Sequence, residues 1–309
     1  MTGWNTTRIP DQSGRTAVVT GANSGIGHVT ARELARHGAT VVLACRSAAR
    51  GRAAVTRLRA EVPGATAEFA ELDLASLDSV REFARTFARR HPALDLLVNN
   101  AGVMALPYGR TADGFETQFG VNHLGHFALT GLLLPALLAA APGARIVNVS
   151  SGFHVLGRPG APFGGGEERD YRRWTAYGRS KTANLLFTHE LARRLTAAGS
   201  PVTAAAAHPG YASTNLHAGA AALEGRGIGS RVMALGNAVL AQPAASGALP
   251  TLYAATAPGV PQDGFFGPRL GWRGAPVRSW RAGWTLDDAA GERLWTASEK
   301  LTGVTYPAL

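Results

Sequence analysis

The start of the chain contains a strand pattern, a glycine-rich loop and a helical pattern in immediate succession. Residues 15–20 are apolar and β-branched, and the loop after them spaces its glycines as G-x-x-x-G-x-G before an amphipathic helix pattern. Glycines let the backbone approach a pyrophosphate, which the free N–H groups of a helix N-terminus can bind. This context favours a dinucleotide-binding loop over an ordinary turn. The loop residues assigned to the cofactor are Gly21, Asn23, Ser24, Gly25, Ile26 and Gly27.

The end of the second predicted strand, residues 39–45, indicates which dinucleotide is bound. An acidic residue at this place binds the ribose 2′-hydroxyl of NAD, whereas an arginine accommodates a 2′-phosphate. Cys45 takes the place of the acid, and Arg46 follows it. The sequence therefore predicts NADP(H) as the cofactor, with Arg46 as a phosphate ligand. Arg50 and Arg52 either assist Arg46 or coat the following helix.

The third and fourth predicted strands, residues 66–72 and 94–98, also end in candidate cofactor contacts. Residues at the carboxyl ends of parallel strands lie at the ligand edge of the sheet. We therefore interpret Asp73 as an adenine contact and Leu74 as its apolar wall; alternatively, Asp73 caps the helix at 76–90. After the fourth strand, small residues let the backbone pass near the cofactor. The residues assigned there are Asn100, Ala101 and Gly102.

The fifth predicted strand, residues 144–151, ends in two hydroxyl side chains, Ser150 and Ser151. Because they end a parallel strand, they are expected at the same ligand edge. A sixth strand ends at Ala207, and a turn-like segment follows it. The residues assigned to the cofactor in that segment are Pro209, Gly210 and Thr214.

Tyr177 and Lys181 are four residues apart in a predicted helix, so their side chains lie on one face, one turn apart. A phenol has a pKa near ~10 in water, too high for efficient proton exchange at neutral pH. A neighbouring ammonium favours the phenolate and lowers that pKa. Lys181 and Lys300 are the only lysines among 31 basic residues, so position 181 favours a compact ammonium over a guanidinium. The pair predicts a tyrosine that exchanges a proton with a carbonyl or alcohol oxygen.

The alternation of strands and helices predicts the fold class. Five strand–helix units and a sixth strand indicate one α/β domain over residues 1–309, a Rossmann-type doubly wound parallel sheet of about seven strands with helices on both faces. A substrate flap is expected at 215–240 and a variable tail at 264–309. A long helix is expected at 113–139, where Asn122 is either functional or a buried structural amide.

Composition narrows the class of protein. The net charge of +10 invites a nucleic-acid partner, but the arginines are spread along the chain, so recruitment of anionic ligands is the preferred interpretation. The single cysteine fits a reducing compartment. There is no run of 18 apolar residues and no apolar core of a signal peptide near the start, so we expect no membrane span and a cytoplasmic protein. No metal site is expected.

The motifs described above follow one another in a specific order and spacing between about Gly14 and Leu216. They are Thr20-Gly21-x-x-x-Gly25-x-Gly27, Asn99-Asn100-Ala101-Gly102, Asn122, Ser151, Tyr177-x-x-x-Lys181 and Pro209-Gly210. Together they resemble the short-chain dehydrogenase/reductase family. The phrase at 176–187, the spacing of 26 between Ser151 and Tyr177, and the place of Arg46 resemble its retinol-dehydrogenase-like, NADP-using branch.

The resemblance implies roles for individual residues. Tyr177 would be the general acid/base, and Lys181 would lower its pKa and bind the nicotinamide ribose. Ser151 would hold the substrate oxygen, with Ser150 as the alternative if the register is shifted by one. Asn122 would hold a water that links Lys181 to solvent.

The resemblance also implies an activity. Thr214 would contact the carboxamide of the cofactor, and the chain would form a homo-dimer or homo-tetramer. We expect an NADP(H)-dependent ketoreductase or alcohol dehydrogenase that acts on an apolar carbonyl or alcohol. The alternatives are reduction of C=N or C=C bonds on the same scaffold, a dinucleotide-binding sensor without turnover, and a basic nucleic-acid-binding protein.

Overall fold

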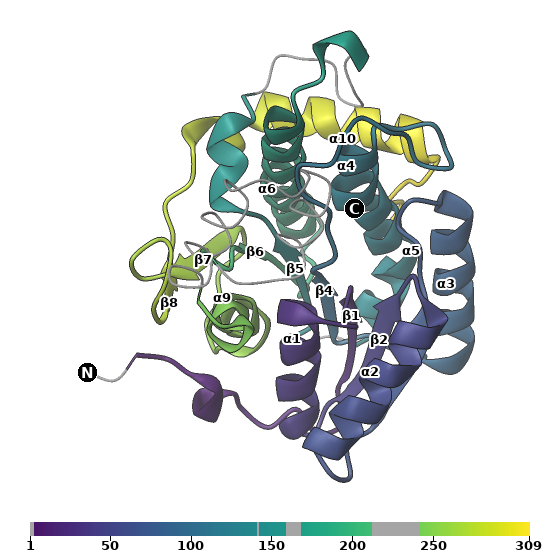
Figure 1. The fold of residues 1–309 in the computed structure, drawn as a ribbon, viewed down its shortest axis with the longest axis vertical. Helices are drawn as coiled ribbons and strands as arrows, with labels where there is room; N and C mark the ends of the chain where they lie inside the picture. The colour runs from purple at the N-terminus through teal and green to yellow at the C-terminus, as the bar shows by residue number, and fades with distance from the viewer. Residues whose placement is uncertain (1–2, 141, 159–167, 212–241) are drawn as a thin grey trace, which may run out of the picture.

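The computed structural model describes residues 3–140, 142–158, 168–211 and 242–309. The expected flap at 215–240 and the expected cofactor contact Thr214 lie outside these residues. Within the described part, an eight-stranded sheet runs through the molecule in the order β3-β2-β1-β4-β5-β6-β7-β8 (Figure 1). The strands are β1 (Thr16–Thr20), β2 (Thr40–Cys45), β3 (Ala67–Glu71), β4 (Leu96–Asn99), β5 (Arg145–Val149), β6 (Thr203–Ala207), β7 (Gly264–Pro268) and β8 (Pro276–Arg278).

Seven strands are parallel, and β8 alone runs antiparallel, along β7. The doubly wound parallel sheet predicted from the sequence is confirmed. The described sheet has eight strands, one more than the expected number of about seven. The extra strand, β8, was not predicted because it is a three-residue edge strand that begins with a proline and carries no alternating pattern. Its register is set by the hairpin with β7, in which Gly267 pairs with Val277.

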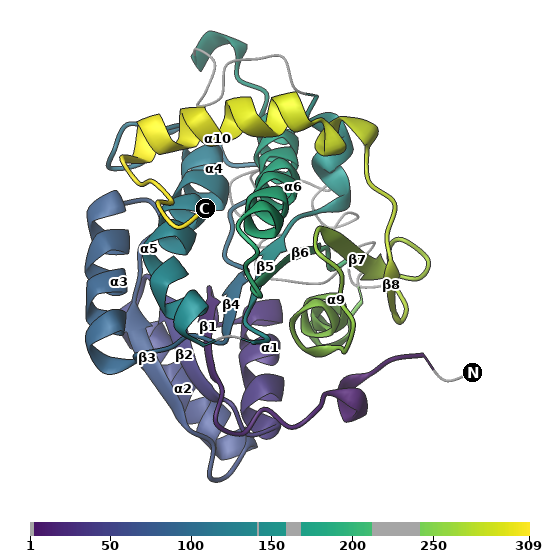
Figure 2. The same cartoon turned by 180° about the vertical axis from the view of Figure 1, so that it is seen from behind.

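Helices cover both faces of the sheet (Figures 1 and 2). On one face, α1, α2 and α9 pack in a core with the inner side chains of β1 and β2. On the other face, α3, α5 and α6 pack together with part of α10. The helices are α1 (Gly25–Arg36), α2 (Ala48–Glu61), α3 (Leu77–Arg90), α4 (Thr117–Phe119), α5 (Gly125–Ala139), α6 (Arg173–Ala197), α9 (Ala244–Thr256) and α10 (Asp288–Thr302).

The helix expected at 113–139 starts later and is not continuous. Glu116 caps it, because its carboxylate accepts hydrogen bonds from the N–H groups of Gln118 and Phe119, each at 2.8 Å. The Asp113 side chain instead accepts from the N–H of Leu77 at 2.9 Å, at the start of α3. Between α4 and α5, residues Gly120–Leu124 form a turn of π-helix, η2, which contains Asn122.

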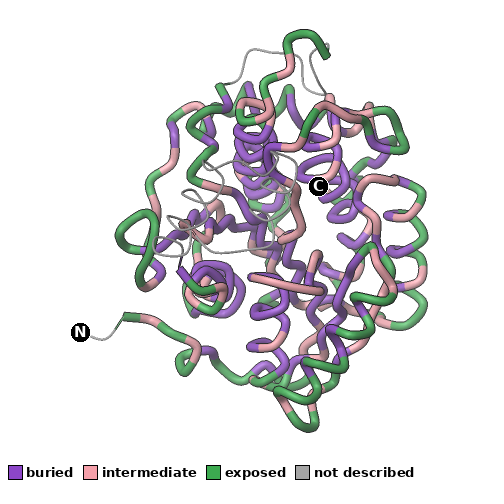
Figure 3. The backbone as a smooth tube through the Cα atoms, viewed as in Figure 1, coloured by how far each residue is buried: buried purple, intermediate pink, exposed green. Residues whose placement is uncertain are grey.

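Within the described residues, one stretch of helix is long and apolar enough to cross a membrane by length and composition alone. It spans Thr117–Ala139, and 78% of its most apolar window is buried inside the fold. Figure 3 shows α5 and the middle of α6 as predominantly buried, next to the buried strands. The apolar character of this helix is therefore explained by its place in the core.

The strand order places the ligand edge of the sheet. β1 lies between β2 and β4, so the connections after β1 and β4 leave in opposite directions and open a crevice at the carboxyl ends of these strands. The glycine loop follows β1, the Asn-Asn-Ala-Gly segment follows β4, and the two serines follow β5. Most residues singled out in the sequence thus lie at one edge.

Candidate active site

A cleft of about 400 Å³ lies at this edge of the sheet. Segments that follow β1, β2, β4, β5 and β6 line it, together with α6. The structure therefore brings together thirteen of the residues assigned from the sequence. They are Gly21, Asn23, Ser24, Gly25, Ile26, Gly27, Arg46, Asn100, Ala101, Gly102, Tyr177, Lys181 and Pro209.

Asp73 and Leu74, the expected adenine contacts, do not line this cleft. Asp73 Oδ1 accepts a hydrogen bond from the N–H of Ala75 at 3.0 Å, and Leu74 is buried. The alternative prediction, that Asp73 caps α3, is wrong. The cap is Ser76, whose side chain accepts from the N–H of Ser79 at 3.3 Å, because Ser76 immediately precedes the first helical residue.

The glycines of the first loop are required by close approach. A Cβ added to Gly27 would lie 2.5 Å from Asn100 Nδ2 and 2.6 Å from the carbonyl oxygen of Gly21. Gly21 has a φ of +66°, and a Cβ there would lie 3.0 Å from Ala101. Ser24 is the N-cap of α1 but makes no side-chain capping bond. The loop thus presents a backbone cradle at an uncapped helix N-terminus, the arrangement that suits a phosphate.

Thr20, the last residue of β1, holds the two cofactor loops together. Its Oγ1 accepts from the N–H of Asn100 at 2.9 Å and from that of Ala101 at 2.8 Å. The Asn100 amide in turn donates to the carbonyl of Thr20 at 2.8 Å. No pattern in the sequence predicted a separate role for Thr20. The feature of the sequence that could have indicated this role is a hydroxyl side chain at the end of β1, the strand next to β4.

A buried imidazole connects Thr20 to the π-helical turn. His126 Nδ1 lies 3.0 Å from the carbonyl oxygen of Asn122, which can only accept, so Nδ1 carries the proton. Nε2 is therefore the acceptor, and Thr20 Oγ1 donates to it at 2.9 Å. Burial lowers the pKa of His126 to about 4, which keeps the ring neutral at pH 7.

Asn122 makes a structural set of contacts. Its Oδ1 accepts from the N–H of Val103 at 2.8 Å, and its Nδ2 donates to the carbonyl of Val103 and to Ser180 Oγ, each at 2.9 Å. The side chain is fully buried and does not line the cleft. The π-helical turn places this amide against the segment that follows Gly102. The expected role of Asn122 in holding a water stays a prediction.

Tyr177 is buried on α6, 6% exposed, with a side-chain hydrogen bond to Ser151. Burial raises the pKa of Tyr177 to about 12, and the Ser151 bond opposes this only in part. Lys181 Nζ lies 5.8 Å from the centre of the tyrosine ring. In the chain by itself the pKa of Tyr177 is therefore raised and not lowered, because loss of hydration is its largest cause. The expectation that Lys181 favours the phenolate stays a prediction.

Lys181 is also buried, and burial lowers its pKa to about 8. Its Nζ donates to the carbonyl oxygen of Val149 at 3.0 Å, at the end of β5. A Cβ added to Gly102 would lie 3.4 Å from Nζ and 3.1 Å from Asn122 Oδ1. The ammonium is thus packed between β5, α6 and the segment after β4.

The two serines after β5 have different partners. Ser150 Oγ donates to the carbonyl of Lys181 at 2.8 Å, which braces α6 against β5, and Ser150 lines the cleft. Ser151 is not among the cleft-lining residues, but its hydroxyl is the one that meets Tyr177. Ser151 Oγ also accepts from the N–H of Phe153 at 3.2 Å. The structure therefore pairs Ser151 with Tyr177 and gives Ser150 a bracing contact.

The cleft is cationic. Among its described lining residues none is acidic, whereas Arg46, Arg50 and Lys181 contribute positive charge. Arg52 lies over the ring of Phe69, 5.7 Å from its centre, and does not line the cleft. Of the two arginines left open from the sequence, Arg50 can therefore assist Arg46, and Arg52 coats α2.

Two aromatic side chains lie beside Tyr177. Phe153 stacks on Trp174 with ring centres 5.2 Å apart, and the centre of the Tyr177 ring lies 6.1 Å from that of Phe153 and 6.5 Å from that of Trp174. Phe153 and Trp174 are 38% and 39% exposed, high values for rings of this size. The sequence offered no pattern that links these two residues, because they come from different segments.

The family follows from a comparison with known protein families. A sequence model described as short chain dehydrogenase matches residues 15–224, about two thirds of the chain. The chain belongs to the short-chain dehydrogenase family. Its glycine loop, Tyr177 and Lys181 all lie within the matched residues.

Curated short-chain dehydrogenases similar to this chain include retinol dehydrogenases. Human retinol dehydrogenase 12 is 41% identical over 297 residues, covering 95% of this chain and 88% of that protein. Human retinol dehydrogenase 13 is 42% identical over 299 residues, covering 96% and 87%. The match to mouse retinol dehydrogenase 12 is 52% identical over 197 residues, but it spans only 64% of this chain and 61% of that protein.

Solved short-chain dehydrogenase-like structures share the fold. An uncharacterised protein from Mycobacterium paratuberculosis is 44% identical, with a TM-score of 0.79 over 99% of this chain and 100% of that one. A short-chain dehydrogenase from Shigella flexneri, solved in complex with NADP, is 26% identical, with a TM-score of 0.55 over 67% and 82%.

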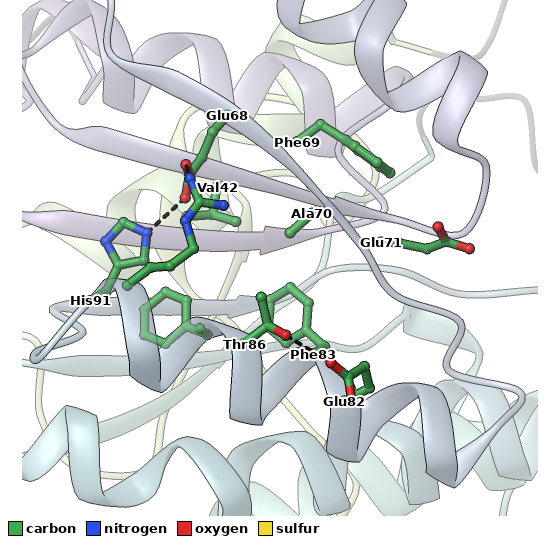
Figure 4. A pocket seen from close by; sticks show the side chains of 11 residues that line it. Val42, Glu68, Phe69, Ala70, Glu71, Glu82, Phe83, Thr86 and His91 are labelled. Carbon is green, nitrogen blue, oxygen red and sulfur yellow. Dashed lines mark hydrogen bonds and ion pairs between the residues drawn. The ribbon is translucent and has the colours of Figure 1, made fainter.

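A second pocket, of about 260 Å³, lies between β3 and α3 (Figure 4). Carboxylates line it, whereas the cleft of the candidate active site is lined by cationic side chains. Glu68 bonds there to His91 Nε2 at 2.7 Å and pairs with Arg90. Glu71 and Glu82 add two further carboxylates. None of the predicted site residues lines this pocket.

Proposed function

We propose that this protein is an NADP(H)-dependent oxidoreductase that transfers hydride between the nicotinamide and a carbonyl or alcohol carbon, with Tyr177 as general acid/base. One observation carries the proposal: Tyr177 and Lys181, one helical turn apart on α6, both line the cleft that begins at the glycine loop, with the Ser151 hydroxyl acting on the phenol. A hydroxyl pair of this kind can hold and protonate one oxygen atom of a substrate.

The residues present fit a dinucleotide. The glycine cradle leaves no room for side chains, and the first turn of α1 is uncapped, so its N–H groups can bind a pyrophosphate. Arg46 and Arg50 would hold a 2′-phosphate at the end of β2, and Lys181 would reach the nicotinamide ribose. When bound, the cofactor supplies or accepts the hydride.

The side chains of this chain handle the proton and the substrate oxygen. With its pKa raised to about 12, Tyr177 is protonated at pH 7, so it can donate to a carbonyl oxygen that becomes an alkoxide. Ser151 holds the same oxygen, and Lys181, mostly charged below its pKa of about 8, stabilises the phenolate left behind. These protonation states favour reduction at neutral pH.

The substrate proposed is an apolar carbonyl compound. Phe153 and Trp174 present exposed ring surface beside Tyr177, and Met104 and Leu106 line the adjoining wall of the cleft. Apolar surface of this kind binds apolar ligands by removing area from water. The similarity to retinol dehydrogenases supports the same class of substrate.

The test compares Tyr177→Phe with the wild-type protein. We expect turnover of ketones or aldehydes, followed by NADPH oxidation, to fall by about 100-fold or more, because only the proton donor is lost. NADPH binding, measured by tryptophan fluorescence, should stay the same. Tyr253→Phe is the matched control, because that ring packs on Phe266, which does not line the cleft.

Three outcomes would contradict the proposal. Near-normal turnover by Tyr177→Phe would remove the general acid/base role. Tight NADPH binding by the wild type without turnover of any carbonyl compound would favour C=N or C=C bonds or a sensor role. Failure of the wild type to bind either nicotinamide dinucleotide would overturn the cofactor assignment.

A further inference from the structure

A buried histidine lies three residues after Ser151. His154 belongs to the 3₁₀ turn η3 (Gly152–Leu156), which connects β5 towards α6, and it is 2% exposed. Its Nδ1 lies 2.7 Å from the carbonyl oxygen of Ser151. Its Nε2 lies 3.1 Å from the main-chain N of Ala282, in the segment between β8 and α10. One imidazole therefore joins the catalytic serine to a segment more than a hundred residues away.

The two contacts determine the tautomer. A carbonyl oxygen can only accept, so Nδ1 carries the proton and donates to Ser151. A main-chain N–H can only donate, so Nε2 is unprotonated and accepts from Ala282. The ring can make both bonds only when it is neutral and protonated at Nδ1.

The turn around His154 leaves little freedom for Ser151. Thr182 Oγ1, on α6, donates to the carbonyl of His154 at 2.7 Å. The N–H of His154 also bonds to the Ser151 carbonyl at 3.1 Å, so that oxygen is held twice. The Phe265 ring stands edge-on to the imidazole, with centres 5.9 Å apart. Ser151 is thus held from its main chain while its hydroxyl bonds to Tyr177.

We propose that His154 is a positioning residue: it holds the main chain of Ser151 so that the hydroxyl meets Tyr177, and it ties this arrangement to the C-terminal segment through Ala282. The inference rests on the proposed function for the role of Ser151. The reaction itself stays with Tyr177 and Ser151, since His154 acts only through the serine. A displacement of about 1 Å at such a site can cost on the order of 100-fold in rate.

The bond pattern makes the arrangement sensitive to acid. Protonation at Nε2 would replace the acceptor with a donor that faces the N–H of Ala282, so this bond would be lost. The charged or titratable groups that act on the ring are Arg281, beside Ala282, and His208, at the end of β6. Burial lowers the pKa of His154 below its usual value, and the positive charge of Arg281 adds to this.

The experiment compares His154→Leu and His154→Asn with the wild type. Leucine removes both bonds. Asparagine places an amide donor near the position of Nδ1, so it keeps the bond to Ser151 and does not titrate. We expect kcat to fall about 10- to 100-fold in His154→Leu and to recover largely in His154→Asn, with NADPH affinity unchanged in both. The acid limb of the kcat–pH profile should weaken in His154→Asn.

A second readout does not depend on turnover. Hydrogen exchange of the peptide around Ala282 should quicken in both variants, because each loses the acceptor for that N–H. His91→Asn is the matched control, since His91 bonds to Glu68 in the separate pocket of Figure 4. A wild-type kcat in His154→Leu, equal loss in both variants, or unchanged exchange would overturn the inference. A wild type that reduces no carbonyl compound would instead defeat the proposed function, and exchange alone would then decide the tie to Ala282.

Discussion

Arg46 and Arg52 are six residues apart, but only Arg46 lines the cleft. Arg52 lies over the ring of Phe69, so it serves as a control of equal charge. We expect Arg46→Ala to weaken NADPH binding about 10- to 100-fold, the value of one or two charge-assisted hydrogen bonds to a phosphate. NADH binding should barely change, because NADH lacks the 2′-phosphate. Parallel fluorescence titrations check this, and equal losses for the two cofactors would show that Arg46 is structural.

Lys181 offers a test of ammonium against guanidinium. Its Nζ is buried, bonded to the carbonyl of Val149 and packed close to Gly102, so a planar guanidinium does not fit. We expect Lys181→Arg to lose about 100-fold or more in kcat although the charge is kept. The control is Lys300→Arg, since Lys300 is the other lysine and is exposed. A mild effect at position 181 would contradict the packing argument.

At the residue scale, sequence spacing predicted which side chains lie close together, but it did not predict their pKa values. Tyr177 and Lys181 meet because helix geometry alone brings residues four apart together. The choice between Ser150 and Ser151 depended on one residue of register, which only the structure resolves. The rise in the pKa of Tyr177 could not be predicted from spacing, because it comes from burial, which is produced by segments far away in the sequence.

At the element scale, the contact between η3 and α6 determines where Ser151 lies. Gly178 allows this contact, because a Cβ there would lie 2.8 Å from Leu156 Cβ and 2.9 Å from the carbonyl oxygen of Phe153. We expect Gly178→Ala to push η3 away from α6, to lower kcat, and to cost about 1–3 kcal/mol of stability. NADPH affinity should stay the same, because the glycine loop is untouched.

Steady-state kinetics and thermal unfolding measure these two effects. Gly283→Ala is the matched control, since a Cβ at Gly283 would meet nothing within 4 Å and its φ is not positive. Unchanged kcat in a folded Gly178→Ala variant would show that η3 can move without disturbing Ser151.

The ends of elements show where sequence patterns stop being informative. Apolar runs located six of the seven parallel strands in the described part to within about two residues, because buried strands need them. The seventh, β7, lies in the stretch that was expected to be a variable tail. The start of the helix before α5 was misplaced because the Asp113 side chain bonds to the N–H of Leu77 in α3, and Glu116 is the N-cap of the local helix. The π-helical turn could not be predicted, since it is an insertion in the backbone register that leaves the apolar pattern intact.

At the scale of the whole molecule, buried neutral histidines make stability depend on pH. Burial lowers the pKa of His123 to about 3 and the pKa values of His126 and His208 to about 4. In each case the unfolded chain binds a proton near pH 6.5 and the folded chain does not. This stabilisation is therefore complete above pH 6.5 and is lost as pH falls. His189 acts oppositely, because Asp263 raises its pKa.

We expect the free energy of unfolding to drop between pH 7 and pH 5 by up to about 2 kcal/mol for each of the three histidines. Urea unfolding at the two pH values measures the drop. His208→Asn should reduce it, because an amide does not titrate. Stability that is flat or rises towards pH 5 would contradict the burial of these rings.

The whole-molecule fold was predictable because parallel strands, crossover helices and their order obey strong rules. Specificity was not, since the rings beside Tyr177 come from Phe153 and Trp174, in separate segments without a shared pattern. The cleft itself needed the structure, because its cationic character arises from residues brought together by the sheet.

The single thiol of the chain has a practical consequence. Cys45 is buried at the end of β2, hydrogen-bonded to the main chain of Ala22 and Asn23, and burial raises its pKa to about 11. A thiol reagent can therefore react with Cys45 only when the neighbouring segment at Ala22 and Asn23 moves away. The rate at which Cys45 is alkylated therefore reports how often this segment opens. Mass spectrometry measures that rate without any label or substrate. A molecule that holds the segment closed would lower the alkylation rate in proportion to the fraction of the protein that has it bound.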